Sequence, residues 1–292
     1  MNTFDLPVLE AILLLLLVAV HTAAGTLATL QLARRHRRHE SLLVSCILVA
    51  VVLDAALLGL RGMSIKAVPL TGLFDSLIVL AFIFGVLYLW VKPAVEQVWF
   101  GSVLVWVILG VVLTAALVAR PASQPQDVAR TPWAVAHAGF MILAAASIVF
   151  AAANSALYLL SSYRLKHRGV MQVLGRIPNM EALARMNRLG VRIGLILLTV
   201  GIASGLRLSS LDIGIARWLA DSKAICIIIA WCLLGATVVL DRLGLLRIKV
   251  RAYVTLAAFG LIIVAIIGVT IAGATRHSFS RADSPATRMV VT

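Results

Sequence analysis

Eight long apolar runs divide the sequence, and they restrict the fold more than any other feature. Each is close to the length of about 20 apolar residues that a helix needs to cross about 30 Å of hydrocarbon. Hydrophobic residues make up 62% of the 292 residues, and mean hydropathy is +1.04. The sequence therefore predicts an all-α, polytopic membrane bundle of about eight transmembrane helices, which cover residues 7–32, 41–60, 70–91, 98–118, 133–161, 190–208, 222–241 and 252–274.

Basic segments between the apolar runs predict the orientation of these helices. The strongest are RRHRRH after the first helix, RLKHRG after the fifth and DRLGLLRIKVR after the seventh. They fall on one side if every helix crosses once, and the positive-inside rule makes that side the cytoplasm. Both termini are then expected to be external. A single transmembrane domain is expected over residues 1–292, with residues 276–292 as a flexible external tail.

The net charge of +14 could indicate nucleic-acid binding, but the basic residues sit in short clusters beside apolar runs. Orientation and contact with anionic lipid headgroups account for such clusters, so membrane lipids are expected as partners and nucleic acid is not. In RIPNMEALARMNRLGVRIG, apolar residues recur at helical spacing with arginines between them. This pattern predicts a cytoplasmic amphipathic helix that lies against the bilayer before the sixth span. The cysteines lie inside apolar runs without CxxC spacing, which predicts reduced thiols at Cys46, Cys226 and Cys232.

The histidines differ in their positions relative to the membrane. Three lie in the cytoplasmic basic clusters, where solvated side chains are favoured over ligation: His36, His39 and His167. His21 lies past the middle of the first helix, where it is either a second functional site or a neutral side chain bonded to a neighbouring helix. His137 begins the fifth helix and His277 follows the eighth, so both are expected on the external side.

The two external histidines could offer two axial nitrogens to one iron ion, because they are carried by different helices at the same face. Trp133 and Phe279 are candidate apolar neighbours of a flat cofactor, and Arg276 could pair with an anionic group on it. The alternative is that both histidines are interfacial side chains that reach into the lipid headgroups.

The loop before the seventh helix, SSLDIGIARWLADSK, is unusually apolar for an external segment. Such a surface is expected to cover the membrane, another helix or a planar ligand, with Trp218 as its largest side chain. Asp221 follows, either as a functional polar group or as the N-cap of the seventh helix. Transport of a small solute or ion is a further function class, for which Asp54 and His21 are the intramembrane candidates.

Several segments resemble, in order and spacing, those of cytochrome c assembly proteins of the CcsA/CcmC type, which include HemX- and YpjD-like members. The resemblance spans most of the chain, and its segments are VPLTGLFDSL, AHAGF, ALYLLSSYRLKHRG, RIPNMEAL, LLTVGIASG and TRHSF. It implies a multi-pass protein of the bacterial cytoplasmic membrane that handles heme at the outer face. It further implies that His137 and His277 are the axial ligands of a heme b iron.

The family's loop pattern, Trp-x-Trp-Asp-Pro-Lys, lies against the heme and corresponds here to RWLADSKA. Trp218, Asp221 and Lys223 occupy matching positions, whereas Ala220 and Ser222 replace the second Trp and the Pro. This departure makes the chain most similar to the HemX- and YpjD-like members.

Two functions follow from the resemblance. The first is binding of heme for its delivery or for cytochrome c maturation, together with a second assembly membrane protein and an apocytochrome. The alternative is a non-catalytic regulator of heme synthesis, or an accessory membrane protein without heme transfer activity. In neither case is the chain by itself expected to be an enzyme, because any synthase activity would need a partner.

Overall fold

The computed structural model describes residues 7–34, 40–70, 72–92, 98–117, 131–166, 179–211 and 219–268. Within these ranges the regular elements are all helical. They are α1 (Val8–Arg34), α2 (Glu40–Ile65), α3 (Leu73–Val91), α4 (Val98–Leu117), α5 (Pro132–Lys166), α6 (Met180–Leu211), α8 (Ser222–Arg242), α9 (Ile248–Ile263) and the π-helical η4 (Val264–Gly268). Seven of the helices are long and apolar enough to cross a membrane. In α4, the apolar helical segment is shorter and covers Gly101–Leu117. The predicted polytopic helical bundle is confirmed.

Two predicted boundaries are wrong. The second helix was expected to end at residue 60 but continues to Ile65, so Arg61 lies inside it. The amphipathic segment expected against the bilayer is the beginning of α6, which runs without interruption from Met180. Leu183 is 2% exposed, and Asn187 donates to the Ala151 carbonyl of α5 at 3.1 Å. Leu183 and Asn187 of this segment therefore pack inside the bundle.

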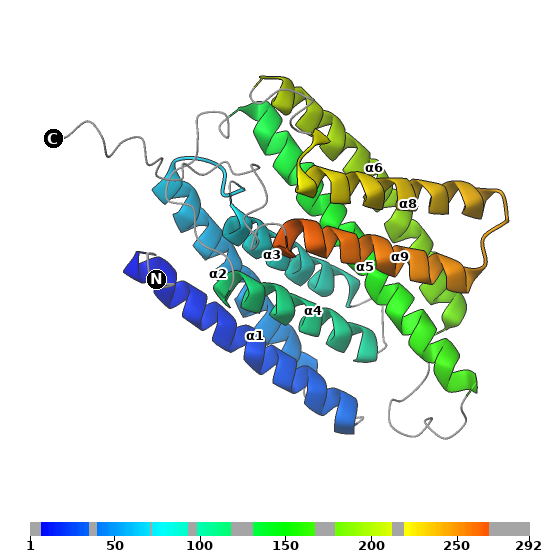
Figure 1. The fold of residues 1–292 in the computed structure, drawn as a ribbon. Coiled ribbons are helices and arrows are strands. Elements are labelled where there is room, and N and C mark those ends of the chain that lie inside the picture. Colours follow the sequence, from blue (N-terminus) through cyan, green and yellow to red (C-terminus); the bar gives the residue numbers. More distant parts are fainter. Residues whose placement is uncertain are drawn as a thin grey trace.

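The helices form two units that lie side by side (Figure 1). The first contains α1 to α4, and its apolar core includes Leu17, Ile47, Phe84 and Ile108. The second contains α5, α6, α8 and α9, with α8 and α9 running obliquely across α5 and α6 (Figure 1). Contacts between α3 and α5 join the units.

The α5–α6 pair is the most extensive helix contact in the described structure, and glycines on α6 make it close. The four glycines form two pairs with GxxxG spacing, Gly190/Gly194 and Gly201/Gly205. A Cβ atom at Gly190 would lie 3.0 Å from the Ala151 Cβ, and one at Gly201 would lie 2.8 Å from the Met141 Sδ. Small residues at this spacing let helix backbones approach closely in membranes, where no hydrophobic effect drives helices together. The same close approach positions His137.

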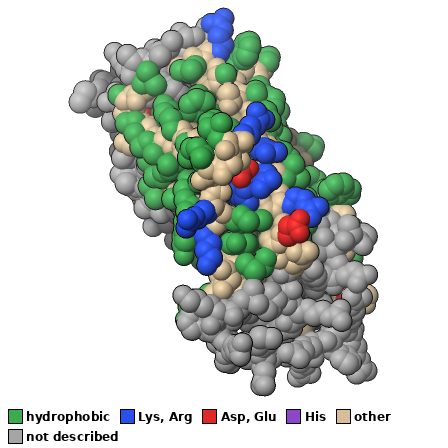
Figure 2. Space-filling model, turned by 90° about the vertical axis from the view of Figure 1, so that its right-hand side faces the viewer, with side chains coloured by type: hydrophobic (Ala, Val, Ile, Leu, Met, Phe, Trp, Pro, Cys, Tyr) green, Lys and Arg blue, Asp and Glu red, His purple; other side chains and the backbone are tan. Residues whose placement is uncertain are grey.

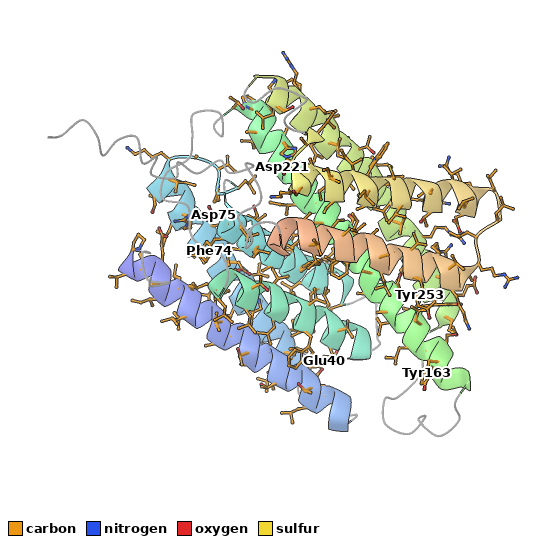
Figure 3. The ribbon with its side chains drawn as sticks, viewed as in Figure 1. Glu40, Phe74, Asp75, Tyr163, Asp221 and Tyr253 are labelled. Carbon is orange, nitrogen blue, oxygen red and sulfur yellow. The ribbon has the colours of Figure 1, made fainter. Side chains whose placement is uncertain are left out.

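The two ends of the bundle differ in their polar groups. We name the end that holds the beginnings of α1, α3, α5 and α8 the outer end, following the orientation that the basic segments predict. Asp75 and Asp221 lie toward this end, and Glu40, Tyr163 and Tyr253 lie toward the opposite, inner end (Figure 3). Tyr163 is 60% and Tyr253 62% exposed, as expected for aromatic side chains at a membrane–water boundary.

Candidate functional site

The structure describes some of the predicted site residues and not others. Trp133, His137 and Asp221 lie in described helices or at their caps, as does the candidate second site, His21. Four predicted residues of the site, together with the predicted tail, lie outside the described residues: Trp218, Arg276, His277 and Phe279. The described part of the candidate site therefore lies at the outer ends of α5, α6 and α8.

His137 is held by a hydrogen bond that fixes its tautomer. Its Nδ1 atom lies 2.7 Å from the Gly201 carbonyl oxygen of α6. A carbonyl can only accept, so Nδ1 donates, and in the neutral imidazole the lone pair then lies on Nε2. The same carbonyl accepts from the Ser204 hydroxyl at 2.9 Å. A backbone carbonyl bonded to one ring nitrogen is the arrangement that orients a metal-binding histidine through its other nitrogen.

Gly205 has no side chain, and this leaves room for the His137 ring to pack against α6. A Cβ atom at this position would lie 2.7 Å from the ring Cε1 and 2.9 Å from Nδ1, closer than real Cβ contacts. His137 lies five residues after Pro132, which places it about 8 Å along α5 from its outer beginning. The ring is therefore packed between two rigid helices, and both its position and its tautomer are set by α6.

Asp221 is the N-cap of α8. Its side chain accepts from the Lys223 backbone N–H at 2.9 Å, and its backbone is extended, as is typical of an N-cap. The residue is 8% exposed. The structure therefore shows that Asp221 caps α8, and its predicted role in the site stays a prediction. Trp133, one turn before His137, is 48% exposed.

Capping predicts a specific order of stability among Asp221 variants. Asp221→Ala is expected to lower the free energy of unfolding by about 1 kcal/mol, whereas Asp221→Asn should stay close to the parent, because Asn caps a helix about as well as Asp. Thermal unfolding of the purified variants measures this difference. Equal losses of bound heme in both variants, at unchanged protein level, would instead indicate a role for the carboxylate charge.

Among the described residues, the Nδ1 atom of His21 bonds within its own helix. This atom lies 3.0 Å from the Leu17 carbonyl of the same helix, and the residue is 1% exposed. Asp54 of α2 is also fully buried, and neither of its carboxyl oxygens has a hydrogen-bond partner among the described residues. Within the described part of the chain, no group of three His, Cys, Asp or Glu side chains could hold a metal ion.

A buried ionic network at the outer end was not recognised from the sequence. Arg61 of α2 donates to both carboxylate oxygens of Asp75 in α3, at 2.9 and 3.3 Å, and to Glu10 of α1 at 3.3 Å. The Ser64 hydroxyl donates to Glu10 at 2.7 Å. Arg61 also lies 5.7 Å from the centroid of the Phe74 ring. Charged residues inside apolar helices usually pair with one another, so their presence was the available signal.

A family model described as "Cytochrome C assembly protein" matches residues 70–277. The chain belongs to this family. The match runs from the segment before α3 to His277, so it includes every predicted ligand residue except His21. Membership gives this multi-pass membrane protein a role in cytochrome c maturation, in a family associated with heme handling. No curated protein matches the chain.

Proposed function

We propose that this protein holds heme b at the outer end of the bundle, with His137 and His277 as axial ligands, and presents it for cytochrome c maturation. The observation that carries the proposal is the geometry of His137. Its Nδ1 donates to the Gly201 carbonyl, which leaves the lone pair on Nε2, the nitrogen an iron ion would bind. Bound heme would supply an iron ion with two axial positions and two anionic propionates.

The end of α9 supports a role for His277 opposite His137. Helix α9 packs against α5, and Ala265 of η4 belongs to the same apolar core as Ala144 of α5. The described chain ends at Gly268, nine residues before His277. Nine residues can span at most about 30 Å when extended. The proposal requires the outer end of α5 to lie within this distance of Gly268.

The other predicted residues have different proposed roles. Trp133 and Trp218 would cover the flat faces or edges of the cofactor with apolar rings, and Arg276 would pair with a propionate. Asp221 would act indirectly, because its side chain caps α8 and so fixes where the loop containing Trp218 rejoins the bundle. The proposed setting is the bacterial cytoplasmic membrane, with a second assembly protein and an apocytochrome as partners.

One observation favours the alternative, a HemX-like regulator or accessory protein that does not transfer heme. RWLADSKA lacks the second Trp and the Pro of the family's loop pattern. Absorption spectra of the purified protein, oxidised and reduced, separate the two functions. A Soret band with low-spin α and β bands on reduction supports heme binding, whereas a colourless protein after heme supplementation supports the alternative.

Gly205→Ala tests the geometry of the site without removing a ligand. The new methyl group would displace the His137 ring, so we expect retained heme to fall by about tenfold, as when a group that orients a metal ligand is lost. Gly139→Ala is the matched control, because it lies two residues from His137 on α5 and a Cβ there meets nothing within 4 Å. Heme content per protein, read from the absorption spectrum, gives the result. Equal heme in the two variants would show that heme retention does not depend on the packing of the His137 ring against Gly205.

A further inference from the structure

At the inner end, three arginines surround one carboxylate. Asp241, at the end of α8, uses Oδ1 to accept from Arg251, which is buried and also donates to Asn187 Oδ1 at 3.1 Å and to the Ala184 carbonyl at 3.2 Å. Its second oxygen, Oδ2, lies 3.1 Å from Arg188 Nε and 3.8 Å from Arg192 Nη2. Arg251 is therefore fully engaged in packing the helices, whereas Arg188 and Arg192 share one oxygen.

Arg188 and Arg192 are left with unmatched positive charge. Asp241 is the one acidic side chain within ion-pair distance of either arginine in the described part of the chain, so two of the three positive charges in the cluster are not balanced. The Arg192 Nε atom is buried and has no hydrogen-bond partner there, and the 3.8 Å contact is too long for a hydrogen bond. Buried donors are nearly always satisfied, so the Arg192 side chain is incompletely paired by the described residues.

The position of the two arginines indicates what could balance their charge. They lie on either side of residue 190, where the expected sixth span begins, and their side chains are 46% and 42% exposed. Beside them on α6, an apolar stripe of exposed side chains continues toward the outer end: Leu189, Ile193, Ile196 and Val200. Two positive charges at headgroup depth, next to an apolar stripe, are complementary to a molecule with a phosphate and a long hydrocarbon chain.

Further basic side chains are exposed just after Asp241 in the sequence, around the turn between α8 and α9. They are Arg242, Arg247 and Lys249. Figure 2 shows Lys and Arg side chains gathered around acidic ones on the side of the molecule that carries this turn. The surrounding surface therefore adds positive potential, which favours an anionic lipid over a zwitterionic one.

We propose that Arg188 and Arg192 form a binding site for the phosphate of an anionic phospholipid, whose acyl chain lies along Leu189, Ile193 and Ile196. The lipid phosphate would contact the exposed parts of the Arg188 and Arg192 side chains and would balance the charge that Asp241 leaves. The site is at the opposite end of the bundle from the proposed heme ligands and does not depend on heme binding. A lipid bound there would hold the inner ends of α6 and α8 at one leaflet of the membrane.

Lipid titrations of the full-length protein in detergent test this site. Phosphatidylglycerol is expected to raise the thermal midpoint of unfolding more than phosphatidylcholine with the same acyl chains. An Arg188→Gln/Arg192→Gln variant should bind phosphatidylglycerol about 25-fold more weakly, at about fivefold for each arginine near a membrane surface. Arg188→Lys/Arg192→Lys keeps the charges and should retain most of the binding, which separates loss of the site from loss of folding.

Arg185→Gln is the matched control. Arg185 lies on the same helix but pairs with Glu181 at 3.6 Å, and both side chains are largely exposed. Its replacement removes one positive charge and should leave phosphatidylglycerol binding within about twofold of the parent, since exposed charges are strongly screened. The proposal is wrong if the two lipids stabilise the parent equally, or if Arg185→Gln loses as much binding as the double variant. Equal stabilisation by inorganic phosphate alone would overturn the assignment to a lipid.

Discussion

Replacing His137 or His277 by alanine is expected to abolish the low-spin, bis-imidazole spectrum of the heme-loaded protein. Each replacement removes one of two axial nitrogens, so the remaining heme should be five-coordinate and high-spin, or should be lost during purification. Added imidazole should partly restore the low-spin spectrum by filling the vacant axial position. Absorption spectra of the oxidised and reduced proteins, at matched protein concentration, measure these changes.

His167→Ala serves as the control for this experiment. His167 belongs to the basic segment that follows α5, on the side that the charge pattern assigns to the cytoplasm. Its removal should leave the spectrum unchanged. If His137→Ala and His277→Ala both keep the parent's low-spin spectrum, neither is a ligand. The two histidines would then be polar groups at the membrane boundary, as the alternative interpretation of the sequence holds.

Much of the bundle could be predicted because membrane thickness sets helix length. The eight apolar runs correspond to α1 to α6, α8 and α9, and the long fifth run is the 35-residue α5. Boundaries were less predictable, because a helix can extend past the hydrocarbon where its polar residues find partners. Arg61 is in helical conformation for this reason: two carboxylates from other helices bind it. No pattern within α2 alone contains that information.

The contacts between helices were harder to foresee than the helices themselves. Hydrophobic periodicity carries little information in a membrane, since lipid-facing and core-facing residues are both apolar. The GVRIG and GIASG segments of α6 did carry a signal, because their paired glycines mark the surface that faces α5. From that signal alone, however, the partner helix could not have been identified. The contact of His137 with Gly201 and Gly205 required the three-dimensional structure.

For the candidate site, residue chemistry indicated candidate groups, and the structure adds the contacts of those that it describes. The sequence left Asp221 as either a functional polar group or an N-cap; the bond from the Lys223 backbone shows the cap, and the functional role stays a prediction. His137 was selected by its place at an outer helix end, and the Gly201 carbonyl now accounts for its tautomer. The pairing of His137 with His277 stays a prediction, because His277 lies outside the described residues.

The Arg61 network connects two parts of the chain with different relationships to the family. The family match begins at residue 70, so Asp75 lies inside it, whereas Glu10 and Arg61 belong to α1 and α2, which precede it. All three charged side chains are at most 4% exposed. Since the bidentate pair with Asp75 is the strongest arginine–carboxylate geometry, it fixes α2 against α3. The network is therefore expected to hold the first two helices onto the assembly domain.

Arg61→Met is expected to lower the free energy of unfolding by about 3–5 kcal/mol, because it leaves two buried carboxylates without their counter-charge. The matched control is Arg61→Met combined with Glu10→Gln and Asp75→Asn. Removing a whole buried ionic group is often close to neutral, so this triple variant should recover most of the loss. Unfolding of the purified proteins in mixed micelles with increasing denaturing detergent measures both values. A single variant within about 1 kcal/mol of the parent, or a triple variant no more stable than the single one, would show that α1 and α2 are held to α3 by apolar packing instead.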